Sequence, residues 1–142
     1  RILSKITKNF IIVTNQSGVS RGIIKENDLI EINNFISREF SSQSIPLLKI
    51  YYCTDHPDDA SINRKPSVGM FLNASKDYDI DLSNCLMIGD SFSDIEPALK
   101  LGMDSMLLMT GNGKIHKKHF GNDSSPTFFA KNILNGAKLL VK

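Results

Sequence analysis

The chain has 142 residues, of which 41% are hydrophobic and 23% are charged, a balance that favours one folded domain over intrinsic disorder. Its 17 Lys and Arg exceed its 15 Asp and Glu by +2, too little to create a strong field for nucleic acid or anionic lipid. Its apolar runs are too short to span a membrane, no signal-like segment opens the chain, and two cysteines form no disulfide framework, so we expect a reduced, cytoplasmic setting.

The first third of the chain predicts two strands joined by a helix. Residues 10–13 (Phe-Ile-Ile-Val) form a β-branched and aromatic run that is typical of a strand buried on both faces. An apolar face at helical spacing follows, made of Leu29, Ile32, Ile36 and Phe40. Asn27 is the expected N-cap of this helix. Residues 47–53 predict the second strand.

The middle of the chain predicts a polar loop, a helix and a third strand. The loop covers residues 54–67, and the helix is indicated by Phe71, Ala74 and Tyr78. Residues 85–88 form an apolar run that breaks at Gly89-Asp90. The next helix is expected to begin with a capping box from Ser93 to Glu96 and to end at Gly102.

The last third predicts a fourth strand over residues 104–109 and a short strand near Phe128-Phe129 before a final helix. Between them, residues 110–126 are rich in Gly, Asn, Lys and His and read as a surface loop. Gly111-Asn112-Gly113 is expected to be a simple turn, since no helical pattern follows it. We expect His116 and His119 to be solvated, because neighbouring lysines would repel a cation.

Strands that alternate with helices predict an α/β fold in which a mainly parallel sheet carries helices on both faces. In such sheets, ligands bind beyond the carboxyl ends of the strands. The polar residues that follow three successive strands are Thr14 to Ser17, the end of the 54–67 loop at Arg64-Lys65, and Asp90-Ser91.

These residue types suit a phosphate site with a metal. Thr14 can donate a hydrogen bond to a phosphate oxygen, Lys65 supplies a compact positive charge, and Arg64 offers a bidentate fork for a second anionic or hydroxylated group. Asp90 follows a glycine that permits a tight turn, and a carboxylate is a ligand that Mg²⁺ prefers. Each signal is weak alone, and their placement after three consecutive strands carries the argument.

At these residues the sequence resembles the haloacid dehalogenase superfamily. Three segments resemble its second, third and fourth motifs: Val13 to Gly22, Arg64-Lys65-Pro66 with Gly69-Met70, and Ile88 to Asp94. The first of them, with Thr-Asn-Gln-Ser-Gly, is similar to the branch that holds D-glycero-D-manno-heptose 1,7-bisphosphate phosphatase and histidinol-phosphate phosphatase. The resemblance covers residues 9–110 and implies a Rossmann-like three-layer fold for a single domain over residues 1–142.

The resemblance also implies a role for each matching residue. Thr14 and Asn15 would hold the transferring phosphoryl group, and Lys65 would neutralise phosphate and nucleophile, which makes Thr14 and Lys65 the expected catalytic residues. The residues expected to contact substrate or line its pocket are Gln16, Ser17, Arg64 and Ser91. Asp90 would bind Mg²⁺, with Asp94 close to the metal site, holding a water or Lys65.

One motif of the superfamily is absent from the sequence. The family's Asp-x-Asp-Gly supplies the nucleophile that forms an aspartyl-phosphate and the general acid and base, but no aspartate precedes Asp28 here. Asp79 and Asp81 have the right spacing, yet they precede a strand, so we interpret them as turn residues. In the family this motif ends a central strand between those of residues 10–14 and 85–89. We therefore expect that this strand is missing and that the chain is a C-terminal portion of a phosphatase. Without the nucleophile, the chain is expected not to turn over.

The loop before Arg64 also departs from the family, whose heptose phosphatases often carry a zinc loop. Cys53 matches that pattern, but Asp55 stands where a histidine should be, and Ser61 and Asn63 replace a cysteine pair. Cys53 and His56 would give two ligands where structural zinc needs four. We therefore expect no zinc and a loop held by prolines and hydrogen bonds.

The resemblance implies a magnesium-dependent phosphatase that acts on a small phosphorylated metabolite, with a heptose bisphosphate favoured. We expect a monomer with no nucleic-acid or membrane partner; the 3′-phosphatase domain of polynucleotide kinase shares some motifs but would need a basic groove. The competing hypothesis is a non-catalytic phosphate- or sugar-phosphate-binding module that has lost the first motif. The sequence leaves the natural substrate open.

Overall fold

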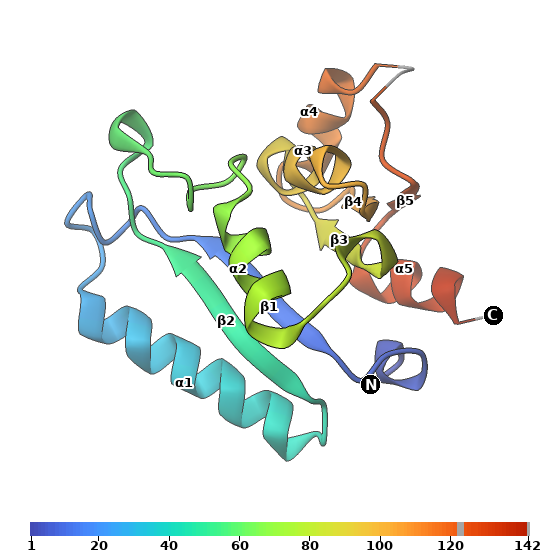
Figure 1. Cartoon of the computed structure of the whole chain (residues 1–142), viewed down its shortest axis with the longest axis horizontal. Helices are drawn as coiled ribbons and strands as arrows, with labels where there is room; N and C mark the ends of the chain where they lie inside the picture. The colour runs from blue at the N-terminus through green and yellow to red at the C-terminus, as the bar shows by residue number, and fades with distance from the viewer. Residues whose placement is uncertain (122–123, 142) are drawn as a thin grey trace. The chain divides into compact units, whose positions relative to one another are not determined.

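The computed structural model describes residues 1–121 and 124–141, and the remaining positions of the expected 110–126 loop and of the C-terminal tail lie outside the described residues. The chain divides into two compact units, Arg1–Ala74 and Ser75–Lys142. Each unit is built from parallel strands with helices between them (Figure 1). The predicted α/β class is confirmed, and the prediction of a single domain over residues 1–142 stays a prediction.

The first unit is a β-α-β arrangement followed by a loop and a helix. Its elements are a 3₁₀ turn at Leu3–Lys5, β1 (Phe10–Asn15), α1 (Glu26–Ser42), β2 (Leu47–Cys53), a 3₁₀ turn at Pro57–Asp59 and the start of α2 (Gly69–Tyr78). Strands β1 and β2 pair in parallel, with Thr14 opposite Tyr52 and Asn15 opposite Cys53. This register brings the end of β1 level with the end of β2, where the loop that leads to Lys65 begins.

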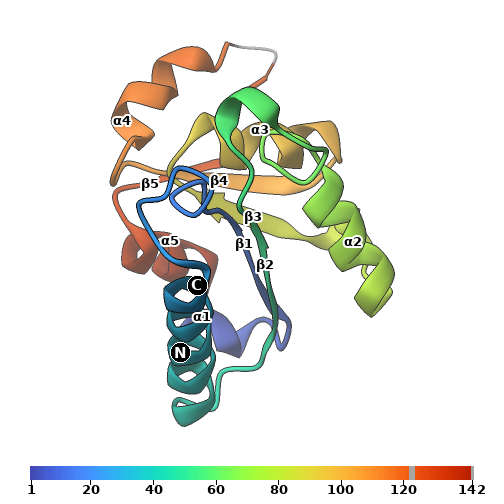
Figure 2. The same cartoon turned by 90° about the vertical axis from the view of Figure 1, so that its left-hand side faces the viewer.

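Helices cover both faces of the β1–β2 pair, because alternate residues of a strand point to opposite faces. On one face, Ile11 and Val13 pack with Tyr51 and Cys53 of β2 and with Met70 and Ala74 of α2. On the other face, the ring of Phe10 meets Phe40 of α1 edge-on, at a centroid separation of 6.5 Å. Figures 1 and 2 show α1 and α2 on opposite sides of the two strands. Strand β1 is thereby held between two packed layers.

The second unit is a three-stranded parallel sheet in the order β3-β4-β5. Its elements are a 3₁₀ turn at Leu82–Asn84, β3 (Leu86–Gly89), α3 (Phe92–Lys100), β4 (Asp104–Leu108), α4 (Gly113–His116), a 3₁₀ turn at Lys117–His119, β5 (Phe128–Ala130) and α5 (Ile133–Leu140). The core includes Ile95 of α3 and Met106 and Leu107 of the central strand, all fully buried. Figure 2 shows α3 on one side of this sheet and α5 on the other.

The strands thus form two sheets, and β1 and β3 are not ladder partners among the described residues. In the described part of the chain, β1 is hydrogen-bonded to β2 and β3 is hydrogen-bonded to β4, each along one edge. Direct pairing of these two strands would have contradicted the expectation of a strand between them. That expectation stays a prediction. Within the same described residues, no helix has the length and apolar character that a membrane crossing requires.

The predicted strands are confirmed, whereas three local expectations about helices were wrong. Helix α1 begins two residues earlier than expected, with extended Lys25 rather than Asn27 at its N-cap. The expected surface loop contains α4, which begins directly at Gly113. The capping box of α3 is formed by Ser91 and Asp94 rather than by Ser93 and Glu96, because the helix begins at Phe92. Asp79 and Asp81 do lie in a turn, where Asp81 caps the residues 82–84.

We expect replacement of Leu107 by alanine to destabilise the second unit by about 2–5 kcal/mol, because it would leave a cavity beneath the central strand. Leu107 has 0% of its surface exposed. Leu134→Ala in α5 is the matched control, since Leu134 is 51% exposed and should change the unfolding free energy by roughly 0.5 kcal/mol or less. Urea denaturation followed by circular dichroism measures both, and equal losses would contradict the assigned core.

Candidate functional site

At the end of β1, the hydroxyl of Thr14 donates to no group in the described part of the chain. Thr14 is the penultimate residue of β1, and its Oγ1 accepts a hydrogen bond from Nε2 of Gln16 at 3.1 Å. The backbone N–H of Gln16 is in turn fixed by the Cys53 carbonyl, at 2.7 Å. A hydroxyl has one donor and two acceptor positions. The Thr14 hydroxyl can therefore accept from Gln16 and still donate to an anion.

Asn15 connects the end of β1 to Lys65, which is 50 residues away in the sequence. Its Nδ2 donates to the Lys65 carbonyl at 2.9 Å, and its Oδ1 accepts from the Lys65 N–H at 3.0 Å. The two bonds together fix the backbone of Lys65 beside the strand end. The side chain of Asn15 is thus engaged with the main chain, and the expected contact of Asn15 with a phosphoryl group stays a prediction.

Lys65 is the buried cation of the first unit, with 6% of its surface exposed. Its Nζ donates to the carbonyl of Val13 at 2.6 Å. Val13 directly precedes Thr14, so the ammonium group lies at the same end of β1 as the Thr14 hydroxyl. Burying a charge is costly unless hydrogen bonds or opposite charges compensate it. A cation and a hydroxyl donor at one strand end form an arrangement suited to an anion such as phosphate.

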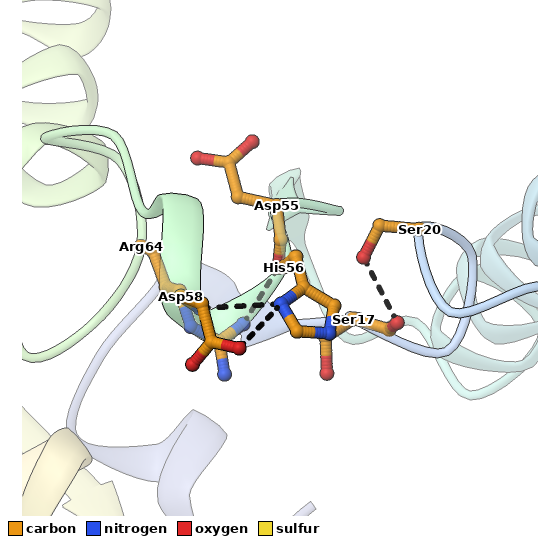
Figure 3. A network of polar contacts seen from close by, with 6 residues as sticks. All are labelled: Ser17, Ser20, Asp55, His56, Asp58 and Arg64. Carbon is orange, nitrogen blue, oxygen red and sulfur yellow. Dashed lines mark hydrogen bonds and ion pairs between the residues drawn. The ribbon is translucent and has the colours of Figure 1, made fainter.

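The loop that carries Arg64 is held by hydrogen bonds, several of which Figure 3 shows. Nη1 of Arg64 donates to the carbonyl of Asp55 at 3.0 Å, which leaves the other guanidinium donors available among the described residues. The Asp55 carboxylate accepts from the N–H of Ser61 at 2.8 Å. Hydrogen bonds from the Ser61 hydroxyl and N–H hold the pKa of Asp55 below its usual value. His56 Nδ1 accepts from the N–H of Asp58 at 3.2 Å.

The turn before α1 is also ordered by local hydrogen bonds. The Ser20 hydroxyl donates to the carbonyl of Ser17 at 3.1 Å (Figure 3). The carbonyl of Gly18 accepts from the N–H groups of Ile23 and Ile24. Gln16 and Ser17 therefore begin a short, internally bonded loop directly after β1. Their expected contact with substrate stays a prediction.

In the second unit, Asp94 organises the turn between β3 and α3. One carboxylate oxygen, Oδ2, accepts from the Ser91 hydroxyl at 2.7 Å and from the N–H groups of Asp90 and Ser91 at 3.2 Å. A Cβ at Gly89 would overlap this carboxyl group, so only glycine leaves room for it. Asp94 is 8% exposed and acts on the main chain of the turn. Ser91 is the N-cap of α3.

Asp90 follows β3 and has one carboxylate oxygen that can reach a ligand. Its Oδ2 accepts a hydrogen bond from the N–H of Asn112 at 3.3 Å, whereas Oδ1 has no hydrogen-bond partner among the described residues. An available carboxylate oxygen beside a strand end fits the preference of Mg²⁺ for oxygen ligands. Residues 1–121 and 124–141 contain no group of three or more His, Cys, Asp or Glu that could hold a metal. Mg²⁺ commonly needs only one or two carboxylates, with water and phosphate completing its shell.

The residues predicted from the sequence thus fall into two groups, one in each unit. Thr14, Lys65 and Arg64 belong to the first unit, and Asp90 and Asp94 belong to the second. Sequence reasoning missed the contacts that residues 111–116 make with the turn at Asp90. His116 was expected to be solvated, but it is partly buried, and its Nδ1 accepts from the N–H of Phe92 at 2.9 Å. A main-chain partner 24 residues away leaves no signal in a sequence.

Two known proteins with similar sequences are both named heptose-1,7-bisphosphate 7-phosphatases. The chain is 35% identical over 111 residues to D-glycero-alpha-D-manno-heptose-1,7-bisphosphate 7-phosphatase of Campylobacter jejuni, covering 77% of this chain and 63% of that protein. It is 34% identical over 118 residues to D-glycero-beta-D-manno-heptose-1,7-bisphosphate 7-phosphatase of Photorhabdus laumondii, covering 77% of this chain and 62% of that protein. The chain therefore spans less than two thirds of the length of these relatives.

A solved structure shares the fold. The crystal structure of D,D-heptose 1,7-bisphosphate phosphatase from B. bronchiseptica, complexed with magnesium and phosphate, matches with a TM-score of 0.86 and 28% identity. The match covers 98% of this chain and 77% of that one. The sequence model of the HAD-hydrolase-like family matches residues 62–135, a little over half of the chain. The chain belongs to the HAD-hydrolase-like family.

Proposed function

We propose that the protein is a magnesium-dependent phosphatase that hydrolyses a small phosphorylated metabolite, most specifically a heptose bisphosphate. The observation that carries the proposal is the end of β1, where the Lys65 ammonium binds the Val13 carbonyl and the next residue, Thr14, has a hydroxyl with a spare proton. The names of the relatives in Campylobacter jejuni and Photorhabdus laumondii support the substrate class. Heptose bisphosphates carry phosphate groups and several hydroxyls, which match the charge and donors of this loop region.

Each residue of the first unit has a role in this proposal. Lys65 balances the negative charge of the phosphate oxygens, and Thr14 donates a hydrogen bond to one of them. Arg64 binds the remainder of the substrate through the guanidinium donors that Asp55 does not use. Gln16 orients the Thr14 hydroxyl, and Ser17 lines the loop beside it. Asn15 holds Lys65 in place through the main chain.

The second unit supplies the metal ligand in this proposal. Asp90 presents Oδ1 to Mg²⁺, while Asp94 and Ser91 fix the turn that carries it. When bound, Mg²⁺ supplies positive charge to the oxygens of the transferring phosphoryl group. The reaction also needs an aspartate nucleophile, which would carry the phosphoryl group before water releases it. No residue of this sequence is assigned to that step, since no aspartate precedes Asp28.

We expect this chain not to turn over without the aspartate nucleophile, so activity is tested on protein that carries it. The assay measures phosphate release with Mg²⁺ from heptose 1,7-bisphosphate, histidinol phosphate and an aryl phosphate. The proposal expects release, with the highest kcat/KM for the heptose bisphosphate. Release with a preference for another substrate would keep the phosphatase and remove the heptose assignment. Phosphate binding without release from any substrate would favour the competing hypothesis of a non-catalytic binding module.

In protein that carries the aspartate nucleophile, we expect Lys65→Met to lower kcat/KM by roughly a hundredfold or more, because the variant loses the cation that balances phosphate charge. Lys8→Met is the matched control, since the Lys8 Nζ also donates to a backbone carbonyl, that of Ser4 at 3.3 Å, but in an exposed position. Circular dichroism confirms that both variants are folded. A Lys65→Met enzyme that keeps kcat/KM within about threefold of the wild type would contradict the role of Lys65. A threefold change corresponds to well under 1.4 kcal/mol of transition-state stabilisation, since 1.4 kcal/mol is about tenfold in rate.

We also expect the purified protein to contain no stoichiometric zinc. Cys53 and His56 would supply only two of the four ligands that structural zinc needs, and the carboxylate of Asp55 already accepts from the N–H of Ser61 at 2.8 Å. Burial raises the pKa of the Cys53 thiol. Inductively coupled plasma mass spectrometry of protein expressed with added zinc provides the measurement. One zinc ion per chain, lost in a Cys53→Ser variant, would show that this expectation is wrong.

A further inference from the structure

Residues 111–116 make close contact with the turn that carries Asp90. The N–H of Asn112 donates to Oδ2 of Asp90 at 3.3 Å. Gly111 has a φ of 49°, in the left-handed region, and a Cβ at this position would overlap Oδ2 of Asp90. A Cβ at Gly113 would overlap the carbonyl of Leu108, at the end of β4. The segment therefore approaches Asp90 closely enough to leave no room for a Cβ at Gly111.

A second contact attaches the same segment to the beginning of α3. His116, the last residue of α4, accepts from the N–H of Phe92 through Nδ1 at 2.9 Å. Phe92 is the first residue of α3, whose initial N–H groups have no partner within the helix. The ring of Phe92 also contacts His119 and Phe120, at centroid separations of 6.0 and 5.5 Å. The turn at residues 89–92 is thus held at Asp90 and at Phe92.

We propose that Gly111 and His116 are positioning residues for the Asp90 carboxylate. The Asn112 N–H and the close backbone of Gly111 fix Oδ2, so that Oδ1 is presented in one orientation. His116 anchors the other end of the segment, so that the Asn112 N–H stays in register with Asp90. The inference rests on the proposed role of Asp90 as the Mg²⁺ ligand, and it assigns a function to a segment that the sequence predicted to be a solvated loop.

The alternative is that the segment only stabilises the fold, and one glycine pair separates the two cases. Gly111→Ala introduces a side chain in the left-handed region and against Asp90. Gly102→Ala introduces the same side chain at a φ of 68°, in the same unit, but with no heavy atom within 4 Å. Both variants carry a backbone cost, since left-handed φ disfavours a Cβ. Only Gly111→Ala displaces the carboxylate.

The experiment measures binding of Mg²⁺ and of Mn²⁺ to the purified protein by isothermal titration calorimetry with inorganic phosphate present. We expect Gly111→Ala to weaken metal binding by about tenfold or more, the usual effect of disturbing the support of a metal ligand. Gly102→Ala should bind metal within about twofold of the wild type, because its cost falls on the backbone alone. Thermal melting without metal checks that the two variants lose similar stability.

A pair of His116 variants provides a test that does not depend on the folding of Gly111→Ala. His116→Phe keeps a planar ring but removes the acceptor for the Phe92 N–H, and it should weaken metal binding. His116→Asn keeps an acceptor oxygen near the position of Nδ1 and should restore most of the affinity. Equal affinities for the wild type, Gly111→Ala and His116→Phe would overturn the inference.

Asp90→Asn separates failure of this inference from failure of the proposed function. If Asp90→Asn abolishes metal binding while the Gly111 and His116 variants bind normally, Asp90 is a ligand and the positioning inference is wrong. If Asp90→Asn binds metal as the wild type does, the proposed metal ligand is wrong and the positioning inference falls with it. Loss of affinity in both Asp90→Asn and Gly111→Ala, with Gly102→Ala unaffected, supports both.

Discussion

The two hydrogen bonds between the Asn15 amide and the main chain of Lys65 are the constraint on which the candidate phosphate site depends. They join a strand end to a loop 50 residues further along the chain. An amide side chain that donates and accepts at once reproduces the pairing of a β-ladder and therefore fixes both position and direction. With its main chain fixed, Lys65 can place its ammonium group on the Val13 carbonyl, beside Thr14. Because the backbone of Lys65 is already fixed, holding its ammonium group there costs only the conformational entropy of the side chain.

In the second unit, a carboxylate rather than an amide fixes the main chain at a strand end. Asp94 collects three donors on one oxygen and so fixes the turn after β3, and Gly89 is the residue that lets it approach. In both units, most polar side chains near the strand ends bind the main chain. Among the described residues, the groups with hydrogen-bonding capacity to spare include the Thr14 hydroxyl, the Arg64 guanidinium and Oδ1 of Asp90. This division between supporting and available groups is what favours a site for phosphate and a hard cation.

Much of this arrangement could be predicted from the sequence, because its signals are local. The run Leu47–Cys53 predicted β2 with its observed bounds, and Gly89-Asp90 predicted a turn after a strand. The capping box was misplaced by two residues, because Ser91 and Ser93 both offer a suitable hydroxyl and only the start of the helix decides between them. The roles of Asn15 and His116 could not be predicted. Their partners are backbone groups 50 and 24 residues away, which any residue type would provide.

The central claim is that the Lys65 ammonium and the Thr14 hydroxyl at the end of β1 bind a phosphate group. The most direct test is the affinity of the protein for inorganic phosphate, measured by isothermal titration calorimetry. The account predicts that Lys65→Met and Thr14→Val each weaken phosphate binding, because the first removes the cation and the second removes the hydroxyl donor, whereas Lys8→Met leaves the affinity unchanged. Equal phosphate affinities for the wild type, Lys65→Met and Thr14→Val would contradict it.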